Sequence, residues 1–106
     1  MSKYYLVLST TDSKEVAEQI AHRIVKERLA ACVNIISDIT SVYKWKGTVE
    51  RANENLLVIK STQERLPQLI EYIKELHTYE LPEVIALPIE DGNPPYLDWL
   101  VSQTTE

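Results

Sequence analysis

The fold is decided by the stretch Cys32–Ser61, which reads CVNIISDITSVYKWKGTVERANENLLVIKS. Both of its halves are rich in β-branched and aromatic residues, which favour extended strands. Gly47 stands between the halves, where the tip of a hairpin is expected. The alternation slips near Ser37 and Asp38, which predicts a bulge or a bend. The sequence therefore predicts a long β-hairpin at the centre of the chain.

A strand and a helix are predicted before this hairpin. The stretch Tyr4–Thr10 is β-branched and aromatic without a breaker, which predicts a strand buried on both faces. Residues 11–15 resemble a capping box, in which Asp12 accepts from the first helical N–H groups and Glu15 reaches back. Apolar residues then recur at helical spacing from Val16 to Val25.

A second helix, a strand and a short helix are predicted after the hairpin. Residues 61–64 form another capping signature, and residues 66–76 carry one apolar helical face. Residues 84–89 read as a last strand, at the sheet edge or near its own end because of Pro88. Residues 96–101 fit a short amphipathic helix, and the tail from Ser102 is expected to fray. The order β-α-β-β-α-β indicates an α+β, ferredoxin-like sandwich with a short C-terminal helix. We expect residues 1–106 to form one domain.

The composition excludes several classes of protein. One cysteine excludes an internal disulfide and a cysteine-rich metal site, and two glycines exclude a phosphate-binding glycine loop. Sixteen acidic against eleven basic residues give a net charge of −5, which argues against nucleic acid as a partner. The longest uncharged run, residues 29–37, is about half of the roughly 18 residues that a membrane span needs. The N-terminus does not read as a signal peptide, so we expect a cytoplasmic protein.

The length of the hairpin suggests oligomerisation. A domain of 106 residues is about 35 Å across, whereas strands of about 14 residues reach about 45 Å. The hairpin either bends back over its own sheet or pairs with another subunit. Tyr43 and Trp45 near its tip favour the second alternative, because aromatic residues are enriched at interfaces.

Candidate chemistry lies at three places. His77 is followed by Tyr79, Glu80 and Glu83, and imidazole with oxygen ligands could hold copper, nickel or zinc. The alternative is that His77 caps the preceding helix. Glu54 and Lys60 are expected on the same face of one strand, as a buried pair or with Lys60 as an anion-binding group.

Cys32 is expected to be a small core residue, since a soft-metal role requires it to reach His77 or a neighbouring subunit. Tyr96 and Trp99 are expected to pack the terminal helix. The pattern contains no nucleophile with an oriented base and an oxyanion donor, so we do not expect an enzyme. An acylphosphatase-like site would need an anion cradle after the first strand, and residues 9–12 lack arginine and glycine. An RNA-binding module would need aromatic residues on the central strands, and residues 56–59 have none.

Five segments together resemble the CutA family of divalent-cation tolerance proteins. These are Glu27–Asn34, Ser41–Gly47, Ile59–Thr62, His77–Val84 and Pro88–Leu100. The resemblance covers nearly the whole chain. It implies a ferredoxin-like fold in a tight PII-like homotrimer, with the long hairpins augmenting neighbouring sheets. It also implies a cytoplasmic, non-enzymatic role in tolerance of copper and other divalent ions, without an obligatory cofactor.

The resemblance also implies a binding cleft between subunits. His77 matches the histidine that the family uses as a metal ligand, and Cys32 is a candidate second ligand for Cu²⁺ or another divalent cation. The other cleft residues that the resemblance implies are Glu54, Lys60, Tyr79 and Glu83. The residues implied for the cleft walls, at the trimer interface, are Tyr43, Trp45 and Trp99.

Departures from the family pattern weaken the expectation of copper binding. Ser9 stands where some members have cysteine, and Leu76 precedes His77 where some have two adjacent histidines. Thr78 replaces a proline that usually follows the histidine. The alternative function is a metal-independent trimeric scaffold, or a PII-like signalling protein, that binds another protein.

Overall fold

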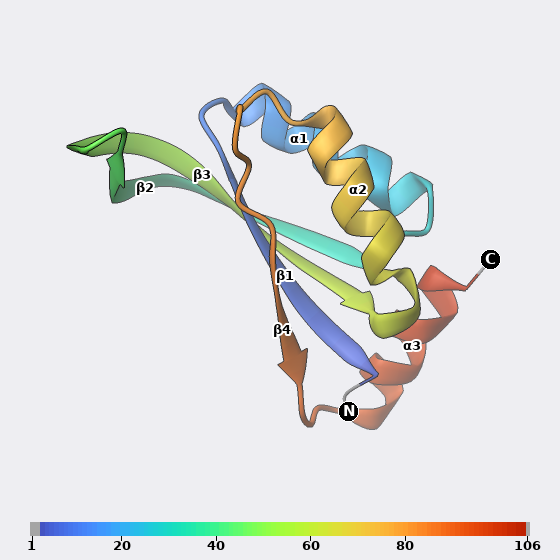
Figure 1. Cartoon of the computed structure of the whole chain (residues 1–106). Helices are drawn as coiled ribbons and strands as arrows, with labels where there is room; N and C mark the ends of the chain where they lie inside the picture. Colours follow the sequence, from blue (N-terminus) through green and yellow to red (C-terminus); the bar gives the residue numbers. More distant parts are fainter. Residues whose placement is uncertain (1–2, 106) are drawn as a thin grey trace.

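The computed structural model describes residues 3–105. In chain order its elements are β1 (Tyr4–Thr11), α1 (Lys14–Lys26), β2 (Cys32–Trp45), β3 (Thr48–Thr62), a 3₁₀ turn (Gln63–Arg65), α2 (Leu66–Leu76), β4 (Ile85–Ile89) and α3 (Pro94–Thr104). Within this part of the chain, four strands form one antiparallel sheet in the order β2-β3-β1-β4. Helices α1 and α2 lie side by side on one face of it (Figure 1). The α+β, ferredoxin-like prediction is confirmed.

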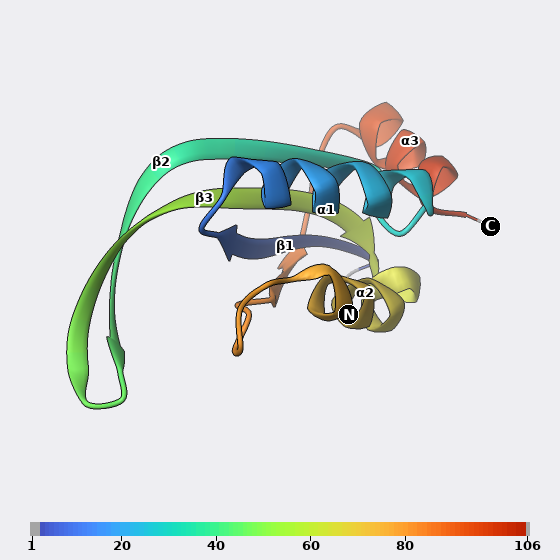
Figure 2. The same ribbon diagram turned by 90° about the horizontal axis from the view of Figure 1, so that it is seen from above.

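The β2–β3 hairpin has the predicted tip and the predicted bulge. Lys46 and Gly47 both have positive φ, 49° and 82°, as the tight turn between two twisted strands requires. The register shifts between Ile36 and Ile39, and Asp38 has a φ of 60°. Figure 2 shows the distal half of the hairpin curving away beyond the two helices, and the molecule measures 44 × 25 × 23 Å.

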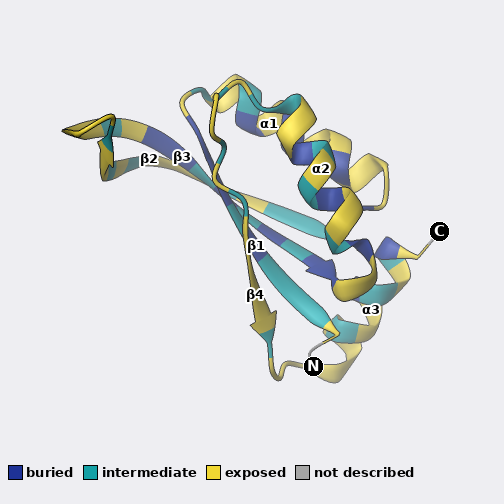
Figure 3. Ribbon diagram, in the orientation of Figure 1, coloured by how far each residue is buried: buried dark blue, intermediate teal, exposed yellow. Residues whose placement is uncertain are grey.

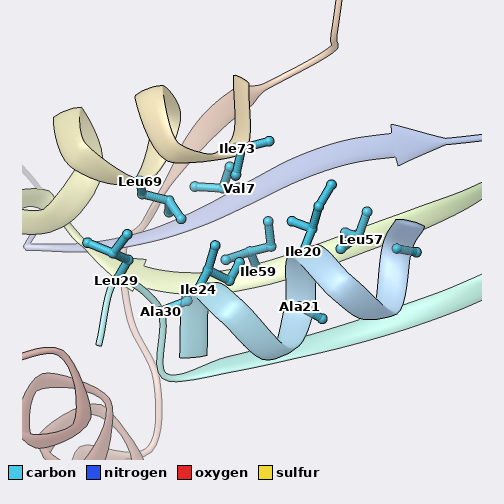
Figure 4. Packing of buried hydrophobic residues seen from close by; sticks show 11 residues of the cluster. Val7, Ile20, Ala21, Ile24, Leu29, Ala30, Leu57, Ile59, Leu69 and Ile73 are labelled. Carbon is cyan, nitrogen blue, oxygen red and sulfur yellow. The ribbon is translucent and has the colours of Figure 1, made fainter. Parts of the chain in front are cut away.

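The hydrophobic core lies between α1, α2 and the sheet. Its side chains pack together in Figure 4, and Figure 3 shows buried segments on the strands and on both helices. Full burial of a valine, leucine or isoleucine side chain contributes about 1.5–3 kcal/mol. The fully buried members from strands and helices are Val7, Ala17, Ile20, Ile24, Leu57, Ile59, Leu69 and Ile73.

The opposite face of the sheet is covered only in part within residues 3–105. The register of the strands sets Leu6 beside Leu87 and Leu8 beside Ile85, on the face away from the core residue Val7. Leu6 and Leu8 are half-buried, and Leu87 and Ile85 are exposed. The prediction that the first strand is buried on both faces is therefore wrong for this chain alone. Helix α3 packs against β3, near one end of this face.

The predicted capping box of α1 is wrong in detail. Ser13, not Asp12, is the N-cap, and its hydroxyl accepts from the N–H of Val16 at 3.1 Å. This shift by one residue puts Val16 where the box needs a glutamate, so Glu15 cannot reach back. In the second signature, the Ser61 hydroxyl instead donates to the carbonyl of Leu29 at 2.6 Å.

The end of the chain is more ordered than the sequence suggests. Helix α3 runs on to Thr104, which is buried, so the expected fraying from Ser102 is wrong over these residues. The Arg28 side chain donates to the carbonyls of Ser102 and Thr105, at 3.1 and 2.7 Å, and holds the last turn. Over residues 3–105, none of the helices has the length and apolar content needed to cross a bilayer.

Candidate ligand-binding cleft

A cleft of about 770 Å³ lies between the distal half of the hairpin and the loop that follows α2. The hairpin curves round on the side where this loop runs (Figure 2). Three aromatic residues, Tyr43, Trp45 and Tyr79, line the cleft. Its acidic lining residues are Glu54, Glu80 and Glu83, and its basic one is Lys44.

Glu54 and Tyr79 form a hydrogen bond within this cleft. The phenol of Tyr79 donates to Oε2 of Glu54 at 2.6 Å, which joins the loop to β3. Glu54 is 7% exposed, an unusual degree of burial for a carboxylate. Burial of the phenol, followed by the bond to Glu54, raises the pKa of Tyr79 far above its ordinary value. Tyr79 thus remains a donor to Glu54 throughout the neutral range.

His77 ends α2 and is fastened to backbone at both ring nitrogens. Its Nε2 lies 2.6 Å from the carbonyl oxygen of Thr10, and its Nδ1 lies 3.1 Å from the amide nitrogen of Tyr79. A carbonyl can only accept and an amide N–H can only donate, so the proton sits on Nε2. The ring also packs 4.7 Å from that of Tyr79. A metal ion could bind His77 only by displacing one of these backbone partners.

Lys60, Cys32 and Trp99 lie elsewhere, in a group between the base of the hairpin and α3. The ammonium of Lys60 contacts Oδ1 of Asn34 and lies 4.0 Å from Sγ of Cys32. Burial, and then the neighbouring Cys32, raise the pKa of the Tyr96 hydroxyl. Tyr96 in turn packs against Trp99 with ring centroids 5.4 Å apart.

The structure thus divides the candidate residues into two groups. Glu54, Tyr79, Glu83, Tyr43 and Trp45 line the cleft, with the ring of His77 packed against that of Tyr79. The expected Glu54–Lys60 pair is wrong, because Glu54 bonds to Tyr79 and Lys60 contacts residues of β2.

Sequence reasoning missed several residues of this cleft, among them Thr10 and Lys44. Thr10 acts through its carbonyl, which no residue pattern reveals, and nothing in the sequence distinguishes Lys44 from an ordinary surface residue of the hairpin. Within residues 3–105, no three His, Cys, Asp or Glu side chains are arranged to hold a metal ion. The donors of one chain by themselves therefore do not fit a copper site.

Comparison with known sequences agrees with this architecture. The family described as CutA1 divalent ion tolerance protein matches residues 5–103. The divalent-cation tolerance protein CutA of Thermus thermophilus is 52% identical over 99 residues, which are 93% of this chain and 96% of that protein. The mouse protein CutA is 52% identical over 97 residues, 92% of this chain but 54% of its own length. The chain thus spans about half of the mouse relative. A rice relative, named protein CutA 1, chloroplastic, is 48% identical over 101 residues, which are 95% of this chain and 57% of that protein.

Solved structures superpose on nearly every residue. The CutA1 structure from Thermus thermophilus has a TM-score of 0.94 at 50% identity and covers 96% of this chain and 99% of its own. That of CutA1 from Oryza sativa has a TM-score of 0.95 at 46% identity and covers 99% of this chain and 96% of its own. Sequence and fold agree over the same residues, and the chain belongs to the CutA1 divalent ion tolerance protein family.

Proposed function

We propose that this chain forms a homotrimer that serves divalent-ion tolerance as a non-enzymatic binding protein in the cytoplasm. Its ligand, a metal ion such as Cu²⁺ or a small molecule, would bind in the cleft between the hairpin and the loop after α2. One observation carries the proposal: residues from β2, β3 and the loop after α2 converge on one cavity around the part-buried Glu54–Tyr79 bond.

The uncovered sheet face supports assembly. Ile36, Ile85 and Leu87 on this face are 48, 51 and 42% exposed. Several exposed apolar side chains on one face of a sheet are typical of an interface. The hairpin also extends past the helices with long strand segments that could pair with a neighbouring sheet. A trimer would bury this face and would place parts of neighbouring subunits at each cleft.

The setting of His77 supports binding in place of catalysis. Both ring nitrogens are engaged by backbone groups, so the ring is fixed as a structural link between α2 and β1. It is not poised to take a proton from a neighbouring nucleophile. A divalent ion in the cleft would instead meet carboxylate oxygens, among them those of Glu54 and Glu83. Cys32 would serve a separate site, one that needs donors from another subunit.

Native mass spectrometry with and without Cu²⁺ tests this proposal. We expect a trimer in both conditions. One copper retained per chain and released by Glu54→Gln would identify the metal ion, and not a small molecule, as the ligand of the cleft. A matched control is Glu90→Gln, which removes the same charge from an exposed residue outside the cleft lining. His77→Ala reports separately whether the ring exchanges a backbone partner for the metal. A monomer, or copper binding that all variants keep, would contradict the proposal.

A second candidate function is a metal-independent scaffold or PII-like signalling protein that binds another protein. The observation in its favour is the apolar lining of the cleft, where Val42 is 66% and Leu81 is 70% exposed. Exposed apolar side chains on a curved surface fit a protein partner. A trimer that retains neither copper nor a small-molecule ligand would favour this second function over the first.

A further inference from the structure

We infer that the cleft selects a small organic cation, such as a protonated amine or a guanidinium, held between carboxylates and aromatic rings. This inference rests on the proposed function, because it names the ligand class of the same cleft. Three glutamates, Glu54, Glu80 and Glu83, face one lysine, Lys44, in the lining, so the cleft carries a net negative charge. Because Glu54 is buried, its charge is screened less by water than that of an exposed carboxylate.

The negative charge of the cleft favours any cation, and its aromatic lining favours organic cations in particular. Tyr43, Trp45 and Tyr79 supply π faces, which attract ammonium and guanidinium groups. The chain itself shows that one of these rings accepts a cation, since Nζ of Lys46 lies 5.7 Å from the centroid of the Trp45 ring. Lys46 is exposed at the hairpin turn, so a ligand cation could replace it or use the opposite ring face.

The size and donor set of the cleft disfavour a bare metal ion. A volume of about 770 Å³ lies in the range of small-molecule sites, about 300–1,000 Å³. A metal ion needs several converging donors, and residues 3–105 present no such group of three. The ring of His77, the usual borderline ligand, is held by Thr10 and Tyr79. An organic cation needs none of these donors, because charge and ring faces suffice.

The Glu54–Tyr79 bond would fix the anchoring charge of this site. Tyr79 is a neutral donor, so its bond orients the Glu54 carboxylate without neutralising it. The carboxylate is therefore preorganised, and a ligand loses less binding free energy in ordering it. Glu54 is the residue whose neutralisation should weaken cation binding most.

Three probes of matched shape and different charge test the inference: benzylammonium, benzyl alcohol and benzoate. Trp99→Phe leaves Trp45 as the only tryptophan, so its fluorescence reports on the cleft, and calorimetry on the unaltered protein gives the dissociation constants. Agmatine and spermidine extend the series to a guanidinium and a polyamine. We expect the cations to bind, and benzyl alcohol and benzoate to bind at least about tenfold more weakly.

Two variants assign the effect to named residues. Glu54→Gln and Trp45→Leu should each weaken cation binding about tenfold, and Glu90→Gln should leave it unchanged. Circular dichroism checks the fold of both variants. If Trp45→Leu disturbs the hairpin, Glu54→Gln still tests the inference, because glutamine has nearly the same shape as glutamate. Equal binding of benzyl alcohol, or no binding of any cation to the trimer, overturns the inference. Stoichiometric copper binding that is lost in Glu54→Gln would overturn this inference but support the proposed function. A monomeric protein would contradict the proposed function itself.

Discussion

The two faces of the sheet are built from the same strands and differ in what covers them. On one face Val7, Leu57 and Ile59 are 0% exposed under α1 and α2. On the other, Ile85 and Leu87 are 51 and 42% exposed, although they are as apolar as the first set. The chain supplies helices for one apolar face and leaves much of the other uncovered within residues 3–105.

In the proposed trimer, this difference separates the residues that fold one subunit from those that join subunits. Side chains under the helices stabilise the fold of one subunit, whereas those on the other face would stabilise contacts between subunits. The two faces should therefore respond to different mutations in different measurements. The following predictions test that separation, from the largest expected effect to the smallest.

Ile59→Ala should have the largest effect, because it opens a cavity under both helices. Losing a buried isoleucine side chain lowers the free energy of unfolding by about 2–5 kcal/mol. Ile85→Ala removes the same atoms from the uncovered face and should change monomer stability by less than about 1 kcal/mol. Equilibrium urea denaturation at several protein concentrations measures both. Equal losses that do not depend on concentration would show that the two faces are not distinct.

Leu87→Glu should break the assembly and leave the subunit folded. A charge buried at the centre of an apolar interface weakens association by about 2 kcal/mol or more. Val25→Glu on α1 is the matched control, since Val25 is 41% and Leu87 42% exposed. Light scattering should give a smaller mass for Leu87→Glu alone, with unchanged circular dichroism. If Val25→Glu dissociates the assembly as well, the uncovered face has no special role.

Arg28 links the loop after α1 to α3, which lies near the end of the uncovered face. Arg28→Ala loses both bonds to the carbonyls of Ser102 and Thr105 and should cost about 1 kcal/mol. Arg28 has a φ of 59°, so Arg28→Gly loses the same bonds but relieves a strained backbone. Thermal unfolding should therefore rank the wild type first, Arg28→Gly second and Arg28→Ala last. The reverse order of the two variants would mean that the backbone is not strained.

Tyr79→Phe should show its effect most directly in an alkaline titration, because the readout there is the ionisation of a single tyrosine. The fold raises the pKa of Tyr79 above its unfolded value of about 10, so the folded state holds this proton more tightly. The resulting stability is complete below about pH 10 and is lost as the pH rises above that value. Phenolate absorbance during an alkaline titration should lose its highest-pH component in Tyr79→Phe. An unchanged titration curve would show that another tyrosine is the last to ionise.

Local patterns predict the elements of the fold well. The helix faces, the Gly47 tip and the bulge near Asp38 depend on neighbouring residues, so the sequence contains the information. The N-cap lies at Ser13 and not at the predicted Asp12, because several adjacent residues could each cap the helix. The burial of the first strand is less than predicted, because its pattern cannot tell a helix of the same chain from a second subunit.

The cleft is harder to predict than the fold. Glu54 and Lys60 stand out in one strand, but their partners come from other elements, namely the loop at Tyr79 and β2 at Asn34. The bond from His77 to the Thr10 carbonyl joins a side chain to a backbone atom far away in the chain. Contacts of this kind depend on how the helices dock, which single-sequence periodicity does not encode.

The bulge in β2 has a consequence for how the two ends of the hairpin can change. Before it, Ile36 pairs with Leu56, and after it, Ile39 pairs with Glu54, so one extra residue in β2 resets the pairing. Side chains alternate between faces with a period of two, so regular pairing of this stretch without the bulge, with every residue kept, would move the distal side chains of β2 to the opposite face. The bulge therefore shifts the register of β2 against β3 by one residue. Near the base of the hairpin, the alternation of side chains in β2 is fixed by packing against the core. Beyond the bulge the alternation restarts, so a different set of residues can face the cleft.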